Sequence, residues 1–309
     1  MDVVIAGGSG FIGTALQSSL QADGHRVVQM VRPGSAGSGG AAGDTIAWDP
    51  AAARIDAKGL EGVDAVVNLG GVGIGDKKWS ADRKDEILQS RLTSTSLLAS
   101  ALARLQTPPA VFVSASAVGY YGNRGDEELT EDSAPGGDFL AGVCVAWEDA
   151  ARPAAEAGLR VAWIRTGIVL HPSGGVLKQL LLPFKLGLGG RLGKGTQYMS
   201  WITLDDEVGA IRTVIDDPSL GGPVNLTAPN PVTNAEFTAT MGKVLGRPTA
   251  LPTPLLPLKL RYGGELVQHL LLDGQRVLPE KLEAAGYAFG HSELEPALRT
   301  LLGKEPVAA

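Results

Sequence analysis

Short apolar runs alternate with amphipathic segments over the first half of the chain. Asp2 to Ala6 (DVVIA) is an apolar run that ends in glycines, a helical pattern covers Phe11 to Ala22, and a second apolar run covers Arg26 to Val31. Buried parallel strands read as continuous apolar runs, whereas the apolar positions of an amphipathic helix repeat every 3.6 residues. The three segments therefore predict one βαβ unit.

The alternation continues to about residue 170. It predicts further strands at Thr45 to Trp48, Val63 to Leu69, Ala110 to Ser114 and Arg160 to Ile164. It also predicts helices at Asp82 to Leu105 and Leu140 to Ala157. Residues 33–44, rich in glycine and serine, are expected to form a flexible surface loop. Strands that alternate with helices form a parallel sheet with right-handed crossovers. The predicted fold is α/β, a Rossmann-type doubly wound parallel sheet with a smaller C-terminal substrate lobe.

Glycines and prolines interrupt the pattern from His171 onward. A helix at Asp205 to Asp216 and a strand at Val224 to Leu226 are still predicted, followed by short helical stretches between prolines. We expect residues 1–170 to form a nucleotide-binding domain, to which the strand near residues 223–227 returns. Residues 171–309 are expected to form the substrate lobe, which closes over the carboxyl ends of the strands.

Composition and charge narrow the range of partners. A formal net charge of -6 gives no electrostatic reason to expect nucleic acid or an anionic membrane. The single cysteine, Cys144, excludes an internal disulfide, and the four histidines lack metal-ligand spacing, so no metal is expected. The N-terminus lacks a basic region before its apolar run, and no stretch reaches about 18 apolar residues, so we predict a cytoplasmic protein. The expected partner is a small-molecule substrate, and a homodimer stays open.

The turn after the first strand is the strongest candidate site. GGSGFIG, residues 7–13, lies between a predicted strand and a predicted helix, the context in which such a glycine pattern indicates dinucleotide binding. Gly10 leaves room for a pyrophosphate at the helix N-terminus, and Gly13 allows the helix to pack closely on the sheet. The residues expected to contact the phosphates are Gly7, Gly8, Ser9, Gly10, Phe11 and Ile12. A glycine-rich turn without a ligand is the alternative.

The end of the second strand indicates which dinucleotide binds. The strand ends in Val31-Arg32, where an Asp or Glu would otherwise accept hydrogen bonds from the adenosine ribose. A guanidinium group at this place favours a 2′-phosphate, so we expect Val31 and Arg32 to bind the adenosine end of NADP(H). The alternative is an arginine that is merely solvated on a loop.

Candidate catalytic groups follow the strand that ends at Ser114. SASAVGYYG, residues 114–122, resembles the serine-rich strand end of extended short-chain dehydrogenases, in which a serine polarises the substrate carbonyl. Ser116 occupies the matching position. Tyr120 and Tyr121 are the candidate proton donors, with packing at the strand end as their alternative role.

The tyrosine and lysine that this superfamily carries on the next helix are missing. In the superfamily the lysine lowers the pKa of the tyrosine, which exchanges a proton with a substrate oxygen. When Glu148 is aligned with the superfamily's helix glutamate, Leu140 and Cys144 stand where the tyrosine and lysine belong. Cys144 and Trp147 are expected to be core residues.

Long motifs along residues 1–305 resemble one atypical branch of this superfamily, the family of NAD(P)-dependent sugar epimerases that ends in a small C-terminal domain of unassigned function. The motifs are GGSGFIG (7–13), VVNLGG (66–71), KKW (77–79), SRLTST (90–95), SASAVGYYG (114–122), CVAWE (144–148), RTGIVL (165–170), LPFKLGLGGRLGKGTQYMSWI (182–202) and GQRVLPEKLEAAGYAF (274–289). The resemblance implies bound NADP(H). The cofactor contacts expected beyond the glycine turn are Val31, Arg32, Leu69, Gly70, Glu86, Arg91, Ser114, Arg165 and Val169.

The start of the second lobe has the composition of a lid. Its glycine-rich segment carries Arg191, Lys194, Tyr198 and Trp201, which suits a mobile loop over a polar or anionic substrate, although both cations are equally explained as solvated. Asp205 and Asp206 stand at a helix start, and we expect them to act as an N-terminal cap.

Two functions are compatible with these features. The first is an NADP(H)-dependent oxidoreductase or epimerase that acts on a small polar carbonyl or sugar-like substrate. The second is a catalytically silent NADP(H) sensor or partner-binding protein, which the missing tyrosine and lysine favour. We prefer the enzyme, because a pure sensor needs neither a lid nor a second lobe.

Overall fold

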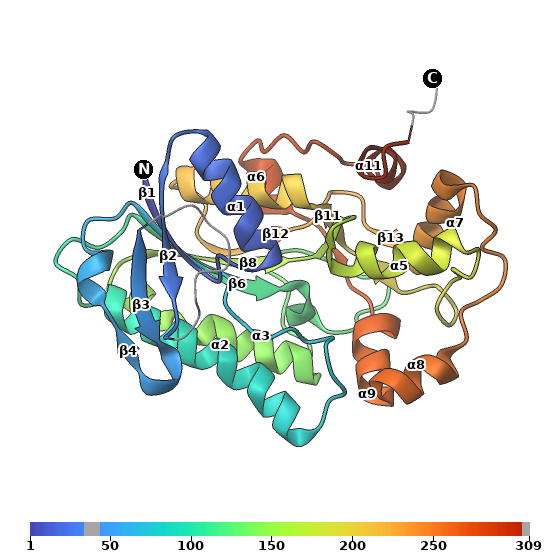
Figure 1. Cartoon of the computed structure of the whole chain (residues 1–309), viewed down its shortest axis with the longest axis horizontal. Coiled ribbons are helices and arrows are strands. Elements are labelled where there is room, and N and C mark those ends of the chain that lie inside the picture. Colours follow the sequence, from blue (N-terminus) through green and yellow to red (C-terminus); the bar gives the residue numbers. More distant parts are fainter. Residues whose placement is uncertain (34–43, 305–309) are drawn as a thin grey trace.

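The computed structural model describes residues 1–33 and 44–304. Nearly all of the loop expected at residues 33–44 lies outside this part of the chain. Figure 1 shows a central sheet with helices above and below it and a smaller group of helices at one end. No helix in the described part is both long enough and apolar enough to cross a membrane. The cytoplasmic location stays a prediction.

The central sheet has eight strands in the order β12-β8-β6-β5-β1-β2-β3-β4. Their bounds, in chain order, are β1 (Asp2–Ala6), β2 (Arg26–Val31), β3 (Thr45–Asp49), β4 (Arg54–Ile55), β5 (Ala65–Asn68), β6 (Val111–Ala117), β8 (Arg160–Thr166) and β12 (Gly222–Leu226). All neighbours pair in parallel except β3 and β4. The predicted Rossmann-type parallel sheet is confirmed, and the predicted strand near residues 223–227 returns to it beside β8.

Helices bury both faces of this sheet. On one face, α1 (Phe11–Ala22) and α6 (Leu204–Asp216) contribute Leu16, Leu20 and Ile211 to a core that includes Val3 and Ile5 of β1. The other face is covered by α2 (Ala81–Leu102), α3 (Phe139–Ala150) and α4 (Arg152–Glu156). Strands buried on both faces need apolar side chains on both, which explains why the runs were readable in the sequence.

Two helices differ from their prediction. The segment expected as one helix at residues 140–157 is divided into α3 and α4, because Pro153 stands in the first turn of α4 and has no N–H to continue the ladder. The helix at residues 204–216, which the division at residue 170 places in the substrate lobe, packs on the sheet beside α1. Chain order alone does not show which face an amphipathic helix covers.

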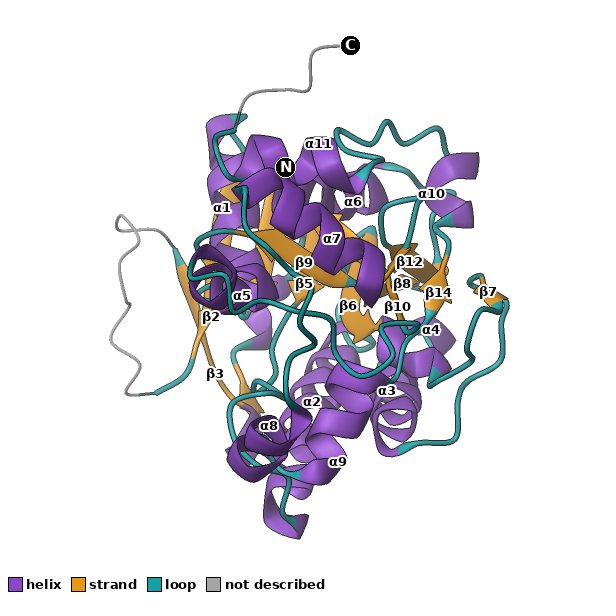
Figure 2. Cartoon of the chain, turned by 90° about the vertical axis from the view of Figure 1, so that its right-hand side faces the viewer, coloured by secondary structure: helices purple, strands orange, loops and turns teal. Residues whose placement is uncertain are grey.

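The remaining elements form the smaller lobe (Figure 2). They are β9 (Ile168–His171), α5 (Gly175–Lys185), β10 (Tyr198–Met199), β11 (Trp201–Thr203), β13 (Val232–Thr233), α7 (Asn234–Leu245), α8 (Leu255–Tyr262), α9 (Gly264–Val267), a π-helix (Gln268–Leu272), β14 (Arg276–Val277) and α11 (Leu294–Leu301). The short helix α10 (Glu280–Ala284) packs against β12 of the central sheet. Leu177, Trp201 and Phe237 are central to the core of this lobe. β14 pairs with β7 (Glu128–Leu129), which follows the short helix η3 (Val118–Tyr121), so the C-terminal segment reaches back to the end of β6.

Candidate functional site

The glycine turn after β1 is as tight as the sequence predicts. Gly7 has a φ of +80°, and a Cβ atom there would stand 2.8 Å from the carbonyl carbon of Leu69. A Cβ atom on Gly13 would stand 2.4 Å from the carbonyl oxygen of Gly7. Neither position accepts a side chain without moving backbone, so the glycines bring α1 close to the sheet edge.

The N-terminus of α1 is free to bind an anion. Gly10 is the N-cap and has no side chain to accept from the first amides, and the first turn of α1 carries no acidic residue. The N–H groups there and the positive end of the helix dipole therefore attract negative charge. A hollow of about 330 Å³ adjoins this turn and is lined by Ser9, Gly10, Phe11, Thr14, Ala15, Ser18, Ser173 and Leu204. The turn fits a diphosphate in backbone shape and in charge.

The predicted adenosine contacts lie at the same sheet edge. Val31 ends β2 and Arg32 follows it with an exposed side chain, one strand away from the glycine turn. Leu69 and Gly70 follow β5 on the other side of β1, and the N–H of Leu69 donates to the carbonyl of Ala6. The turn at Gly70 is held by its N–H, which donates to the side chain of Asn68.

Arg91 and Glu86, both on α2, have different surroundings. The guanidinium group of Arg91 lies over the ring of Trp147 and donates to the carbonyls of Val72 and Ile87, and burial lowers its pKa. Glu86 is exposed and pairs with Arg83 at 2.6 Å. Arg91 is therefore the partly buried cation on the inner side of this helix, and Glu86 faces solvent.

Ser116 and Arg165 meet in a buried network. The Ser116 hydroxyl donates to Oε1 of Glu148 at 2.7 Å, and the Arg165 guanidinium donates to both carboxylate oxygens of Glu148 at 2.9 Å. Arg165 is only 3% exposed. Burial opposes the charge of Arg165, but the hydrogen bonds and the charge of Glu148 outweigh it and raise the pKa of Arg165.

Arg165 and Ser114, both predicted to contact the cofactor, are buried. Arg165 is fully occupied by Glu148, by Tyr121 and by the carbonyl of Glu131, which leaves it no open face. Ser114 is completely buried within β6, and its hydroxyl has no hydrogen-bond partner anywhere in residues 1–33 and 44–304. Strand position showed that both residues lie near the edge, but it did not show how deeply they are buried.

The two candidate tyrosines also differ. Tyr121 is 0% exposed, its hydroxyl donates to Asn225 at 2.6 Å and accepts from Arg165, and burial raises its pKa to about 12. A proton donor must reach its acceptor, so the buried and fully hydrogen-bonded hydroxyl of Tyr121 favours a structural role, and its role as a proton donor stays a prediction. Tyr120 is partly exposed, with its ring 3.5 Å from the Arg165 guanidinium. It stays a candidate.

The positions expected for tyrosine and lysine face the end of β6. A Cβ atom on Gly119 would stand 3.6 Å from Cβ of Leu140 and 3.9 Å from Sγ of Cys144. Burial raises the pKa of the Cys144 thiol to about 12, which makes it inert as a nucleophile. The structure therefore supports the core role predicted for Cys144, and neither of the usual proton-transfer positions carries a side chain that ionises near neutral pH.

Sequence reasoning missed the buried partners of this network. The carboxylate of Glu131 accepts from the N–H of Asn225 at 3.0 Å and from that of Lys281 at 3.3 Å, and burial raises the pKa of Glu131. These residues lie on three segments far apart in the chain. No spacing rule could have joined them.

The remaining predicted residues lie in the smaller lobe. Val169 is in β9 and is half-buried, and Arg191 is exposed and donates to the carbonyl of Gly193. Trp201 is completely buried, so it belongs to the lobe core and not to a lid. The cap of α6 is Thr203, whose Oγ1 accepts from the N–H of Asp206, so the predicted cap at Asp205-Asp206 is wrong.

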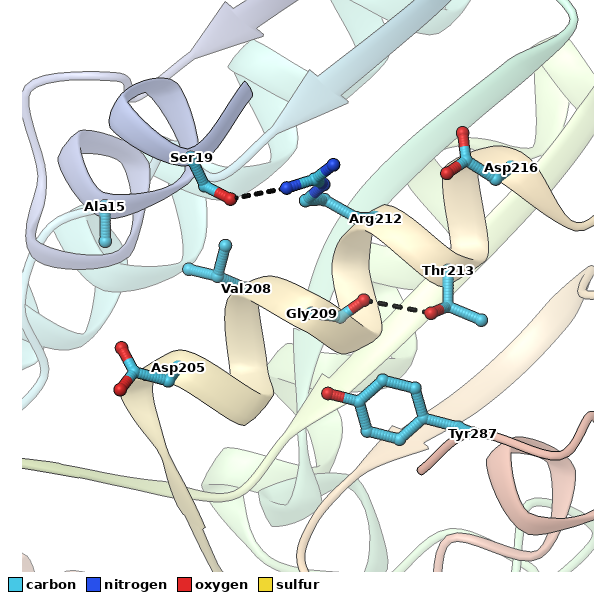
Figure 3. A pocket seen from close by; sticks show the side chains of 9 residues that line it. All are labelled: Ala15, Ser19, Asp205, Val208, Gly209, Arg212, Thr213, Asp216 and Tyr287. Atoms are coloured by element: carbon cyan, nitrogen blue, oxygen red, sulfur yellow. Dashed lines mark hydrogen bonds between the residues drawn. The ribbon is translucent and has the colours of Figure 1, made fainter. Parts of the chain in front are cut away.

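Another hollow lies between α1 and α6 (Figure 3). It measures about 470 Å³ and is lined by Ala15, Ser19, Asp205, Val208, Gly209, Arg212, Thr213, Asp216 and Tyr287. Arg212 crosses it to donate to Ser19 at 2.8 Å. No predicted cofactor or catalytic residue lines this hollow, so its size does not make it the site.

Family comparisons agree with this geometry. Residues 3–226 match the NAD dependent epimerase/dehydratase family, and residues 253–301 match a domain of unknown function, DUF1731. An epimerase family protein of Mycobacterium tuberculosis is 46% identical over 96% of each chain.

Two solved structures have the same fold. The human epimerase family protein SDR39U1, solved with NADPH, is 37% identical, with a TM-score of 0.88 over 98% of this chain and 99% of that one. A nucleoside-diphosphate sugar epimerase of Corynebacterium glutamicum is 36% identical, with a TM-score of 0.80 over 98% of this chain and 58% of the longer one. The chain belongs to the NAD dependent epimerase/dehydratase family and carries a DUF1731 domain at its C-terminal end.

Proposed function

We propose that the protein is an NADP(H)-dependent oxidoreductase or epimerase that acts on a small polar carbonyl or sugar-like substrate. The observation that carries the proposal is the uncapped glycine turn at α1 with Arg32 at the end of the neighbouring strand. The relative solved with NADPH, 37% identical to this chain, supports the same cofactor.

The chain's own residues would hold the cofactor in three places. The amides at the start of α1 would bind the diphosphate, Arg32 would bind the 2′-phosphate, and Leu69 with Gly70 would line the adenosine end. When bound, the nicotinamide would exchange a hydride with a substrate carbon. The protein must then hold the substrate in place and exchange a proton at the substrate oxygen.

The hydroxyl of Ser116 is not free to contact a substrate, because it already donates a hydrogen bond within the protein. Its hydroxyl proton already points to Glu148, whose charge is balanced by Arg165. To polarise a substrate oxygen, Ser116 would have to exchange this hydrogen bond for one to the substrate. Tyr120 offers a hydroxyl at the same strand end, without the lysine that usually lowers the pKa of such a tyrosine.

Calorimetry with NADPH and NADH tests the cofactor. We expect NADPH to bind at least ~10-fold more tightly than NADH, and Arg32→Asp to remove most of that preference, because the guanidinium loses its charge-assisted hydrogen bonds to the 2′-phosphate. Arg54→Asp, an exposed arginine on β4, is the control. Equal affinities in the native protein would contradict NADP(H) selectivity.

NADPH oxidation over a panel of aldehydes, quinones and nucleotide sugars tests the reaction. We expect turnover of at least one compound, and Ser116→Ala is expected to slow it. Mass spectrometry of any small molecule that copurifies would narrow the substrate class.

A silent NADP(H) sensor is the second candidate. It is favoured by one observation, the apolar pair Leu140 and Cys144 at the end of β6. A sensor would bind NADPH tightly and oxidise it with no compound of the panel.

A further inference from the structure

The smaller lobe brings a histidine to the start of the helix that lacks the usual tyrosine. His269 lies on the π-helix Gln268–Leu272, between α9 and β14. Its ring is near Asp138, the N-cap of α3, because ligand atoms of Asp138, His269 and Asp273 all lie within 4.8 Å of one another. Leu140, which holds the tyrosine position, is only two residues after this cap.

The π-helix gives this histidine its setting. Turns with π geometry are rare and are frequently found at functional sites. Here His269 lies within the turn and Asp273 directly follows it. The two side chains are in contact, with Nδ1 of the ring 2.8 Å from Oδ2 of the carboxylate.

Burial and hydrogen bonds fix the side chain of Asp273, as is expected of a carboxylate that orients a histidine. Its side chain is only 7% exposed, and its second oxygen, Oδ1, accepts from the amide of Gln268 at 2.7 Å and from that of Asn123 at 3.3 Å. A carboxylate beside Nδ1 keeps the proton on that nitrogen and leaves Nε2 to exchange one. In the described part of the chain, Nε2 has no hydrogen-bond partner, and the ring is 24% exposed.

An aromatic residue fixes the plane of the ring and ties it to α3. Trp79 stacks on His269 at a centroid distance of 6.2 Å and an interplanar angle of 11°. Trp79 also contacts Phe139, the first residue of α3, edge to face at 5.2 Å, and its own N–H donates to the carbonyl of Ile74. Three segments distant in sequence therefore hold the imidazole at the N-terminus of α3.

A divalent cation is a poorer occupant of this cluster than a proton. Oδ1 of Asp138 already accepts the N–H of Ala141 at 2.9 Å, and Asp273 accepts from two amides and from the ring. These donors compete with a cation for the same lone pairs.

We propose that His269, oriented by Asp273, is the proton-transfer group of this protein in place of the missing tyrosine and lysine. This inference rests on the proposed function. During reduction of a carbonyl, the N–H bond at Nε2 breaks and an O–H bond forms at the substrate oxygen, while the substrate carbon takes a hydride from NADPH, which is oxidised to NADP⁺. The imidazole recovers its proton from solvent, and oxidation of an alcohol reverses each step.

Other charged groups near the ring of His269 also affect the pH profile of activity. Asp138 faces it from α3 and Asp273 from its own segment. Lys84 of α2 pairs with Glu265 of α9 and lies 4.9 Å from the centroid of Phe139. The double variant Lys84→Gln, Glu265→Gln separates their effect from that of His269.

A first experiment needs no substrate. Nuclear magnetic resonance of isotope-labelled imidazole nitrogens is recorded on the full chain alone, with NADPH and with NADP⁺. We expect His269 to carry its proton on Nδ1, Asp273→Asn to abolish that preference, and the Nε2 signal to move when NADP⁺ replaces NADPH. A neutral ring with its single proton on Nε2 would overturn the proposal even if the protein binds NADPH. So would imidazole signals that do not change with either cofactor.

The second experiment uses any compound that the panel identifies. We expect His269→Gln to lower kcat ~100-fold with an unchanged affinity for NADPH, since general acid–base groups contribute at least that much. Added imidazole should restore part of the activity of His269→Ala, and Asp273→Asn should change the pH profile of kcat. His25→Gln, in the turn between α1 and β2, is the matched control.

Two outcomes contradict the inference while leaving the proposed function intact. One is full activity of His269→Gln. The other is evidence that the cluster is a metal site. Such evidence would be activity of His269→Ala that Zn²⁺ restores and imidazole does not, or activity of the native protein that a chelator abolishes. If no compound is turned over, the proposed function fails, and the nuclear magnetic resonance experiment still decides whether His269 faces the cofactor.

Discussion

The two ends of the candidate site are built differently. The cofactor end, at β1, β2 and β5, is made largely of backbone: the positive φ of Gly7, the amides of α1 and the close approach of Leu69. The reaction end, at β6 and α3, is made of buried side chains from distant segments, such as Glu148 with Arg165 and His269 with Asp273. The glycine turn of the first is encoded in consecutive residues, 7–13, whereas the second exists only after the chain has folded.

The largest expected effect is at the reaction end. Arg165→Met leaves the Glu148 carboxylate buried without its partner, which costs about 3–5 kcal/mol of unfolding free energy. Denaturant unfolding monitored by circular dichroism measures the loss. The double variant Arg165→Met, Glu148→Met removes both charges and should recover at least half of it. Equal losses in the single and double variants would contradict the ion pair as the cause.

The next effect is the pH dependence that Glu207 introduces at the face shared by α1 and α6. Burial raises its pKa from 4.5 to about 8, and among the described residues its hydrogen-bond donor is the hydroxyl of Thr166. The folded protein then binds a proton that the unfolded chain releases between these values, so the unfolding free energy falls as pH rises from about 4.5 to about 8, by up to about 1.4 kcal/mol per pH unit.

Glu207→Gln removes this contribution to the pH dependence of the unfolding free energy. Its unfolding free energy should decline less steeply with pH, and at pH 8 the variant should be more stable than the native protein. Thermal unfolding across this pH range provides the measurement, with the exposed Glu156→Gln as control. Parallel pH curves for the native protein and Glu207→Gln would show that Glu207 is ionised in the fold.

The smallest effect belongs to the cofactor end and is local. Gly13→Ala places a Cβ atom 2.4 Å from the carbonyl oxygen of Gly7, which must shift and draw the amides of α1 away from a diphosphate. We expect ~10-fold weaker NADPH binding, about 1.4 kcal/mol, by calorimetry. Gly142→Ala in α3, where a Cβ atom would meet nothing within 4 Å, should bind NADPH as the native protein does.

Most of the fold could be predicted from sequence, because central strands such as β1, β5 and β6 are buried on both faces and the helices repeat their apolar positions. The bounds Phe11–Ala22 and Arg26–Val31 agree between prediction and structure. The break at Ala151 and the place of α6 could not be predicted from that pattern, since periodicity gives the apolar face of a helix and not the surface that it covers.

The sequence by itself determined the sheet, the glycine turn and the arginine that follows β2, because each depends on residues that are neighbours in the chain. Only the tertiary structure decided that Tyr121 and Arg165 are buried and that His269 meets Asp138 across 131 residues. Desolvation and long-range hydrogen bonds set those roles, and both depend on which segments pack together, a property that no local pattern carries.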